Sequence, residues 1–134
     1  RKKGEFDNVK NFNSAYIGAG DLDTQWEKRY TVIARANQVI RNINKVQASA
    51  EAKSKYLGEA LFMSSRMYFE LASNYGDSRA GVPIADRTKE PDIKSAPRAA
   101  NVTENYNYTI ADLKKAIEEY GSYYRSIHRK TSFD

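Results

Sequence analysis

The chain has 134 residues, of which 40% are hydrophobic and 29% charged, and these proportions are ordinary for one globular domain. It contains no cysteine, which excludes a disulfide framework, a cysteine-ligated metal and a thiol nucleophile within this sequence. The net charge of +5 comes from Lys and Arg spread along the chain, with clusters only at residues 1–3 and 125–130, so a solvated surface is favoured over a nucleic-acid interface.

The first 22 residues are polar and irregular, and three glycines interrupt them. No helical or strand period is sustained there, so we expect an extended lead-in over 1–22 that packs loosely on the first helix. Phe12 and Tyr16 lie off any apolar stripe. Together with Asn13 they are candidates for ligand contact.

The first helix is predicted from Thr24 to Lys45. Thr24 and Glu27 have the spacing of a capping box at its start. Apolar residues then recur at steps of three and four, which places them on one stripe: Trp26, Tyr30, Ile33, Ala36 or Asn37, Ile40 and Ile43. Because Trp26 belongs to this stripe, we expect it in the core rather than on a sugar-stacking surface.

The second helix is predicted from Glu51 to Asn74, with Ser49 as its N-cap. Gly58 lies inside this helix and costs about 1 kcal/mol relative to Ala, so close packing against a neighbouring helix is expected there. Gly76 is predicted to end the helix in a left-handed conformation. The short connection between the two helices indicates an antiparallel hairpin over residues 24–75.

Residues 77–100 form the longest irregular segment and contain all three prolines of the chain. A connection of this length without regular structure is unusual in a compact domain and is often functional. We therefore select the loop from Asp77 to Arg98 for ligand or partner contact, with Asp77, Arg79 and Arg98 as the candidate residues.

The third helix is predicted over residues 102–120, with Asn101 and Glu104 as a second capping box and Gly121 as the stop. Residues 122–130 are expected to form a basic loop, and residues 131–134 the start of a truncated fourth helix. Both ends of the sequence therefore look like cuts from a longer chain. If the fourth helix is missing, we expect an exposed apolar stripe that tends to self-associate: Ile110, Leu113 and Ile117.

The sequence gives no positive support to an enzyme or to a cofactor. His128 is the only histidine, so histidine-rich metal motifs are excluded. Glu118 and Glu119 are adjacent on a helix and point in different directions, so they cannot form a tight acid–base pair. No Walker loop or dinucleotide fingerprint is present.

Several motifs in order resemble one family. The first is Trp26, Tyr30 and Ile33 followed by Ala36-Asn37, and the second is Gly58-Glu59-Ala60 leading to Tyr75-Gly76. Gly81-Val82-Pro83, Pro97-Arg98 and Asp112-Leu113 with Ala116 follow. This order and spacing resemble the N-terminal helical part of the SusD/RagB family of outer-membrane nutrient-binding lipoproteins, over about residues 24–117. Ser64 and Ser65 depart from the Arg-Ala pair that is usual in the family.

The resemblance implies an all-α fold of antiparallel, tetratricopeptide-like hairpins with one long loop. It further implies a longer, non-enzymatic protein without a cofactor, lipid-anchored outside this sequence on the extracellular face of the outer membrane. Such a protein binds a glycan or peptide nutrient and delivers it to a TonB-dependent, SusC-like transporter. The ligand is captured by stacking and hydrogen bonding, with no bond chemistry.

Two other functions remain open at this point. A generic tetratricopeptide-like scaffold would bind a peptide or protein partner in a concave groove lined by helix residues, with no role for the long loop. A nucleic-acid-binding protein would show an affinity that falls steeply with salt concentration.

Overall fold

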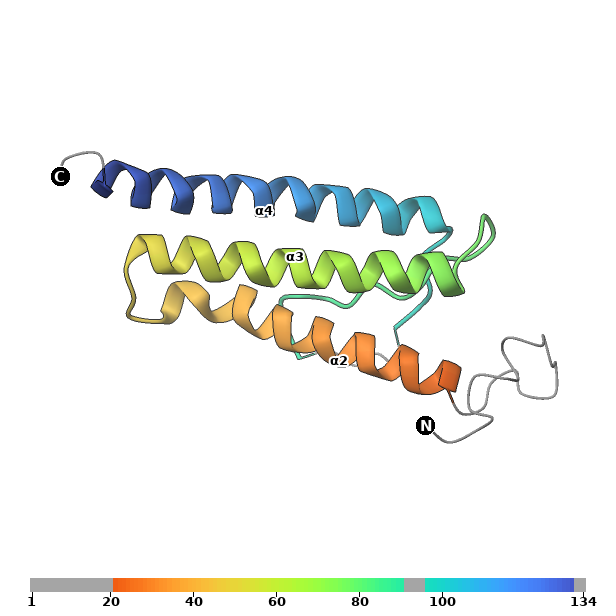
Figure 1. The fold of residues 1–134 in the computed structure, drawn as a ribbon. Helices are drawn as coiled ribbons and strands as arrows, with labels where there is room; N and C mark the ends of the chain where they lie inside the picture. Colours follow the sequence, from red (N-terminus) through yellow and green to blue (C-terminus); the bar gives the residue numbers. More distant parts are fainter. Residues whose placement is uncertain (1–20, 91–95, 132–134) are drawn as a thin grey trace, which may run out of the picture.

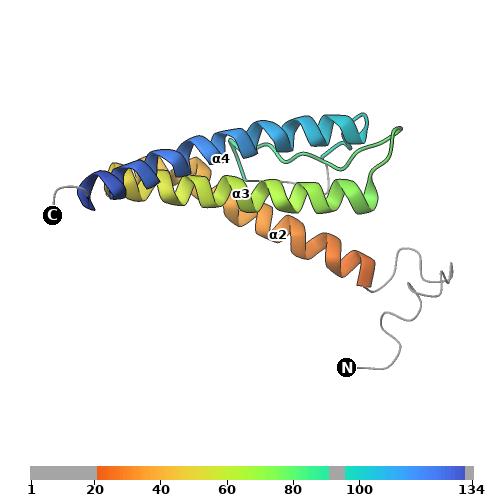
Figure 2. The same cartoon turned by 45° about the horizontal axis from the view of Figure 1, so that its top comes forward.

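The structure is a computed structural model that describes residues 21–90 and 96–131. The described part holds three long helices, α2 (Asp21–Asn42), α3 (Ala50–Tyr75) and α4 (Val102–Thr131), and a short 3-10 turn, η2 (Ile43–Lys45). The helices run side by side in alternating directions with α3 between the other two (Figure 1). Figure 2 shows that α2 diverges from α3 toward its Asp21 end. The predicted all-α fold with an antiparallel hairpin is confirmed.

The hairpin differs from the prediction at both ends of its first helix. Since α2 begins at Asp21, Thr24 lies inside the helix and the predicted capping box at Thr24 is wrong. At the other end, Ile43–Lys45 tighten into a 3-10 turn, which is common at helix termini.

The predicted N-cap of α3 is confirmed, because Ser49 Oγ accepts the Ala52 N–H at 3.1 Å. Gly58 is buried, and a Cβ added there would lie 2.9 Å from Tyr120 Cδ2, which confirms the expected close packing. The left-handed conformation predicted for Gly76 is wrong, since its φ is −104°.

A spatial reason explains the glycine at position 76. An added Cβ would lie 2.8 Å from the Ala72 carbonyl oxygen and 3.3 Å from Val102 Cγ2. The start of α4 packs against the end of α3 at this point. Gly76 therefore provides room rather than an unusual backbone conformation.

The start of α4 was predicted correctly and its end was not. The Glu104 N–H donates to Asn101 Oδ1 at 3.1 Å, and the Glu104 carboxylate accepts the Ala100 N–H at 2.9 Å. The helix then continues through Gly121 to Thr131, so the predicted loop over 122–130 is wrong. One helical glycine costs only about 1 kcal/mol, and packing offsets it. The half-buried Tyr123 ring lies 5.8 Å from the Lys55 ammonium of α3.

The core lies where the three helices and the loop meet. Its buried members are Tyr30, Ile33, Tyr68, Leu71, Ala72 and Val82. Trp26 packs against their edge, with its ring perpendicular to that of Tyr75 at a centroid distance of 5.0 Å. The prediction that Trp26 belongs to the core is confirmed.

Helix α4 turns a largely polar side toward the core. Asn105, Thr109 and Asp112 are buried, whereas Ile110 and Ile117 are 49% and 72% exposed. The predicted exposed stripe is thus confirmed at the two isoleucines, while Leu113 is half-buried. None of the helices within the described ranges is both long and apolar enough to cross a membrane.

Candidate functional site

The long loop doubles back along the helices before α4 begins. Its two limbs pair through an isolated antiparallel bridge between Pro83 and Arg98. The Gly81 N–H donates to the Ala99 carbonyl at 2.8 Å, and the Ala99 N–H donates to the Val82 carbonyl at 3.3 Å. The outgoing limb, residues 82–90, then runs along the three helices.

All three helices hold the main chain of this outgoing limb. The Asn105 side chain accepts the Val82 N–H (2.8 Å) and donates to the Val82 C=O (3.0 Å). Tyr68 Oη accepts the Ala85 N–H (2.9 Å), and Tyr30 Oη donates to the Pro83 C=O (2.7 Å). Arg41 donates to the Lys89 C=O (3.1 Å). Receptors that bind extended peptides use main-chain hydrogen bonds in the same way. This limb of the loop is therefore fixed against all three helices.

Arg87, in the outgoing limb of the loop, has polar partners on all three helices. Its guanidinium donates to Asp112 through Nη1 (3.1 Å) and Nη2 (2.5 Å), and its Nε donates to Asn37 Oδ1 at 3.0 Å. Nη2 also lies 3.5 Å from Ser64 Oγ, and the guanidinium carbon lies 5.3 Å from the centre of the Tyr108 ring. One side chain from the loop thus contacts α2, α3 and α4.

The protonation states of this region are fixed by burial and by the ion pair. Burial raises the pKa of Tyr30 and Tyr68 above the ordinary value of 10.0, so both phenols stay neutral at physiological pH. Burial alone would lower the pKa of Arg87. The hydrogen bond to Asp112 and the neighbouring Tyr108 outweigh that effect and raise it. The cluster is suited to holding a fixed geometry rather than to moving a proton.

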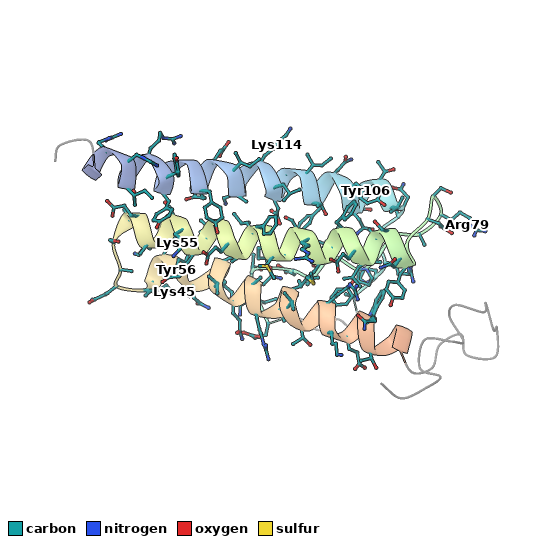
Figure 3. All side chains as sticks on the ribbon, viewed as in Figure 1. Lys45, Lys55, Tyr56, Arg79, Tyr106 and Lys114 are labelled. Atoms are coloured by element: carbon teal, nitrogen blue, oxygen red, sulfur yellow. The ribbon has the colours of Figure 1, made fainter. Side chains whose placement is uncertain are left out.

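The predicted candidates Asp77 and Arg79 form a compact turn at the start of the loop, directly after α3; this turn, residues 77–80, is the loop tip. Asp77 Oδ1 accepts the N–H groups of Arg79 (2.7 Å) and Ala80 (3.0 Å), and its Oδ2 pairs with the Arg79 guanidinium at 3.1 Å. The Arg79 N–H, its guanidinium and the Ala80 N–H hold the pKa of Asp77 below its usual value. The two side chains are 51% and 88% exposed, and Figure 3 shows Arg79 projecting beyond the helices.

The third loop candidate, Arg98, faces the backbone. Its Nε donates to the Gly81 carbonyl and its Nη2 to the Tyr75 carbonyl, both at 2.7 Å. It therefore ties the returning limb of the loop to the end of α3, next to the turn that Asp77 and Arg79 form. The candidates Phe12, Asn13 and Tyr16 lie outside the described residues.

Arg87 was missed by reasoning from sequence, although one signal pointed to it. Ser64 stands where the family pattern has an arginine, so a cation is absent from α3 at that position. Arg87 reaches the same place from the loop and pairs with Asp112. The Asp112 carboxylate accepts both of its hydrogen bonds from this loop arginine.

A separate apolar groove of about 490 Å³ lies between α2 and α3. Its apolar lining includes Val32, Ala36, Val39, Ile43, Val46 and Met63, and the polar residues Arg35, Asn42 and Glu59 also border it. A ligand site normally adds a few convergent polar groups to such a surface. Over residues 21–90 and 96–131, no cluster of acidic or histidine side chains that would hold a metal ion was found.

Comparison with known proteins agrees with this architecture. No curated protein matches the sequence. The crystal structure of a SusD-like carbohydrate binding protein from Bacteroides vulgatus ATCC 8482 matches with a TM-score of 0.76 and 26% sequence identity. The match covers 88% of this chain and 26% of that protein, so the chain spans about a quarter of its relative's length.

The sequence was also compared with models of protein families. The SusD-like model, described as starch-binding and associating with the outer membrane, matches residues 5–132. This match takes in almost the whole sequence, and the chain therefore belongs to the SusD-like family.

Proposed function

We propose that this chain is the helical part of a carbohydrate-binding protein that captures its ligand without changing any covalent bond. The observation that carries the proposal is the family match over residues 5–132, together with a structural relative that is named as a carbohydrate binding protein. The described contacts add that the loop is held firmly on three helices. A loop that is fixed in this way can hold a binding surface at the loop tip in one geometry.

The tip of the loop is the proposed contact within this chain. Asp77 and Arg79 hold each other in place, and both remain largely exposed. A carboxylate and a guanidinium fixed side by side offer acceptors and donors to the hydroxyl groups of a sugar. Arg98 has the role of positioning this tip through the Tyr75 and Gly81 carbonyls. Phe12, Asn13 and Tyr16 remain proposed as further contacts, since aromatic side chains of this kind can stack on a sugar ring.

We infer that the complete protein acts at the extracellular face of the outer membrane. The family description associates its members with that membrane. A lipid anchor outside this sequence would hold the protein there. A TonB-dependent, SusC-like transporter would then receive the bound glycan, with handover by opening of the complex and no chemical step.

The alternative of a generic peptide-binding scaffold finds less support. That alternative requires a concave groove that is free to take an extended partner, and it assigns no role to the loop. On the surface where residues 82–90 lie, their main chain is hydrogen-bonded by Tyr30, Tyr68 and Asn105. A peptide bound there would have to displace this segment and break the Arg87 pair with Asp112. Among the described residues, the groove between α2 and α3 is the remaining surface for such a partner.

The proposal is tested by calorimetric titration of the chain with a maltooligosaccharide, the soluble fragment of starch. We expect binding that Arg79→Ala weakens about tenfold, because a hydrogen bond to a charged group contributes roughly 1.5 kcal/mol. Lys45→Ala is the matched control, since Lys45 is an exposed cation at the opposite end of the helices (Figure 3).

Three outcomes separate the parts of the proposal. Equal weakening by Arg79→Ala and Lys45→Ala would mean a general charge effect and would remove the loop tip from the site. Binding of the sugar by wild type and by Arg79→Ala with equal affinity would keep the carbohydrate function and reject the contact residues. Absence of binding to starch-derived sugars would contradict carbohydrate capture by this part of the protein.

A further inference from the structure

The seam between α3 and α4 follows a line of small residues on α3. A Cβ added at Gly58 would lie 3.4 Å from the Ala116 carbonyl oxygen, so the two helices approach each other closely at this point. Ser65 and Ala72 lie seven and fourteen residues after Gly58. Seven residues make almost two full turns of a helix, so all three positions share one side of α3. All three are buried, and this side of α3 therefore faces α4.

Thr109 is the residue of α4 that lies opposite Ser65. It stands seven residues before Ala116. Because the two helices are antiparallel, a step back along α4 matches an equal step forward along α3, which places Thr109 opposite Ser65. The Tyr68 and Tyr108 rings agree with this register, since they come from neighbouring positions of the two helices and their centroids are 5.4 Å apart.

The hydroxyl groups of Ser65 and Thr109 are both buried and have no hydrogen-bond partner among the described residues. The two residues are 0% and 4% exposed. Almost all buried polar groups in folded proteins have a partner, because a buried hydroxyl without one is destabilising. The Asn37 side-chain nitrogen is also unpartnered, but it belongs to α2, which α3 separates from α4 (Figure 1). Two hydroxyls that face each other across one seam indicate a shared partner.

The chemistry of the seam selects the ligand. Each hydroxyl can donate one hydrogen bond and accept others, and both are neutral, so a neutral molecule that donates and accepts is required. Among residues 21–90 and 96–131 no cluster of acidic or histidine side chains would hold a metal ion. The close approach of the helices at Gly58 favours the smallest ligand. Internal water molecules meet these conditions and commonly bridge buried polar groups.

We propose that the seam between α3 and α4 binds one internal water molecule, held by the hydroxyl groups of Ser65 and Thr109. The water joins the two helices in the middle of their contact. This site does not depend on what covers the outer surfaces of the helices, because both hydroxyls are buried within the described residues. It is also separate from the proposed sugar contact, since Arg79 of the loop tip lies beyond the helix ends (Figure 3).

A high-resolution crystal structure of the chain tests the site directly. We expect a peak of electron density about 2.8 Å from both Ser65 Oγ and Thr109 Oγ1, the usual distance between hydrogen-bonded oxygen atoms. A map without this peak would overturn the proposal. That result includes hydroxyls that bond to each other, and hydroxyls that donate to main-chain carbonyls of their own helices.

Urea unfolding tests the site in solution through the sign of one effect. If a water joins the hydroxyls, Ser65→Ala leaves the water and Thr109 with one partner fewer, so the equilibrium constant for unfolding should rise about fivefold. Without a water, the same change removes an unpaired polar group and should leave that constant equal or lower. Ser122→Ala, at an exposed position of α4, is the control for the helix propensity of alanine.

A double variant tests whether the two hydroxyls share one ligand. Ser65→Ala combined with Thr109→Val removes both hydroxyls and the water with them, so it should lose less stability than the sum of the two single changes. Thr103→Val, at an exposed position of α4, is the control for the exchange of threonine for valine. Strictly additive losses would show that the two hydroxyls do not act on one water and would refute the shared site.

Discussion

Replacement of Arg87 by methionine is the strongest perturbation that the structure suggests. Methionine keeps much of the aliphatic volume but removes the cation from a site where the Asp112 side chain is only 11% exposed. Removal of one partner from a buried ion pair costs roughly 3–5 kcal/mol, because the other charge stays behind without compensation. Arg87 itself is 20% exposed, so water partly relieves Asp112 and the lower end of the range, about 3 kcal/mol, is expected.

Urea and thermal unfolding followed by circular dichroism measure this loss. For a domain of this size, about 3 kcal/mol corresponds to a fall in Tm of roughly 10 °C. Lys89→Met is the control within the same loop, since its ion pair with Asp86 is long, at 3.8 Å, and largely exposed. Such a surface pair contributes at most about 0.5–1 kcal/mol.

A double variant separates the ion pair from simple loss of packing. Arg87→Met combined with Asp112→Leu removes both charges, so it should be more stable than Arg87→Met alone. The reasoning is refuted if Arg87→Met is no more destabilising than Lys89→Met. It is also refuted if the double variant loses the sum of the two single effects, because the two residues would then not be coupled.

Three further predictions concern the backbone and the tyrosines. Gly81→Ala should destabilise the fold by about 3 kcal/mol in urea unfolding, because an added Cβ would lie 2.1 Å from Asn105 Oδ1. Gly121→Ala should stabilise the fold by up to about 1 kcal/mol, since position 121 is inside α4. A loss of stability would instead indicate that the helix ends at Gly121, as the sequence predicted. The contribution of Tyr30 and Tyr68 to the free energy of unfolding should be full below pH 10 and fall above it. The reason is that these tyrosines ionise at the ordinary pKa of 10.0 in the unfolded chain, while burial raises their pKa in the folded protein. Phenolate absorbance that shows all tyrosines titrating normally in the folded protein would contradict this.

The parts of the fold that depend on neighbouring residues were predictable from sequence. The caps at Ser49 and Asn101 each involve residues within one helical turn, and both are confirmed. The spacing of apolar residues likewise predicted the hairpin and the core position of Trp26. Local sequence was misleading at Gly121, because a weak helix breaker was outweighed by packing of the following turns on α3.

The arrangement of the loop was not predictable by the same means. Arg87 has partners 50 residues before it and 25 residues after it, on helices whose relative position no local pattern reveals. The inward side of α4 uses Asn105 and Asp112, so a search for apolar periodicity selects the exposed isoleucines instead. The turn of Asp77 and Arg79 is local, and it was selected from sequence for its place in a long loop.

The position of Arg87 has a consequence for how the protein unfolds. In the described structure, α3 packs against both α2 and α4, which makes the helices a short row of nearest neighbours. A row of this kind tends to melt from its ends, one element at a time. Arg87 joins Asn37 of α2 to Asp112 of α4 and so closes the row into a ring. Together with the hydrogen bonds of Tyr30, Tyr68 and Asn105 to the loop, this closure favours cooperative melting of the three helices, and loss of Arg87 would weaken the coupling between the two outer helices.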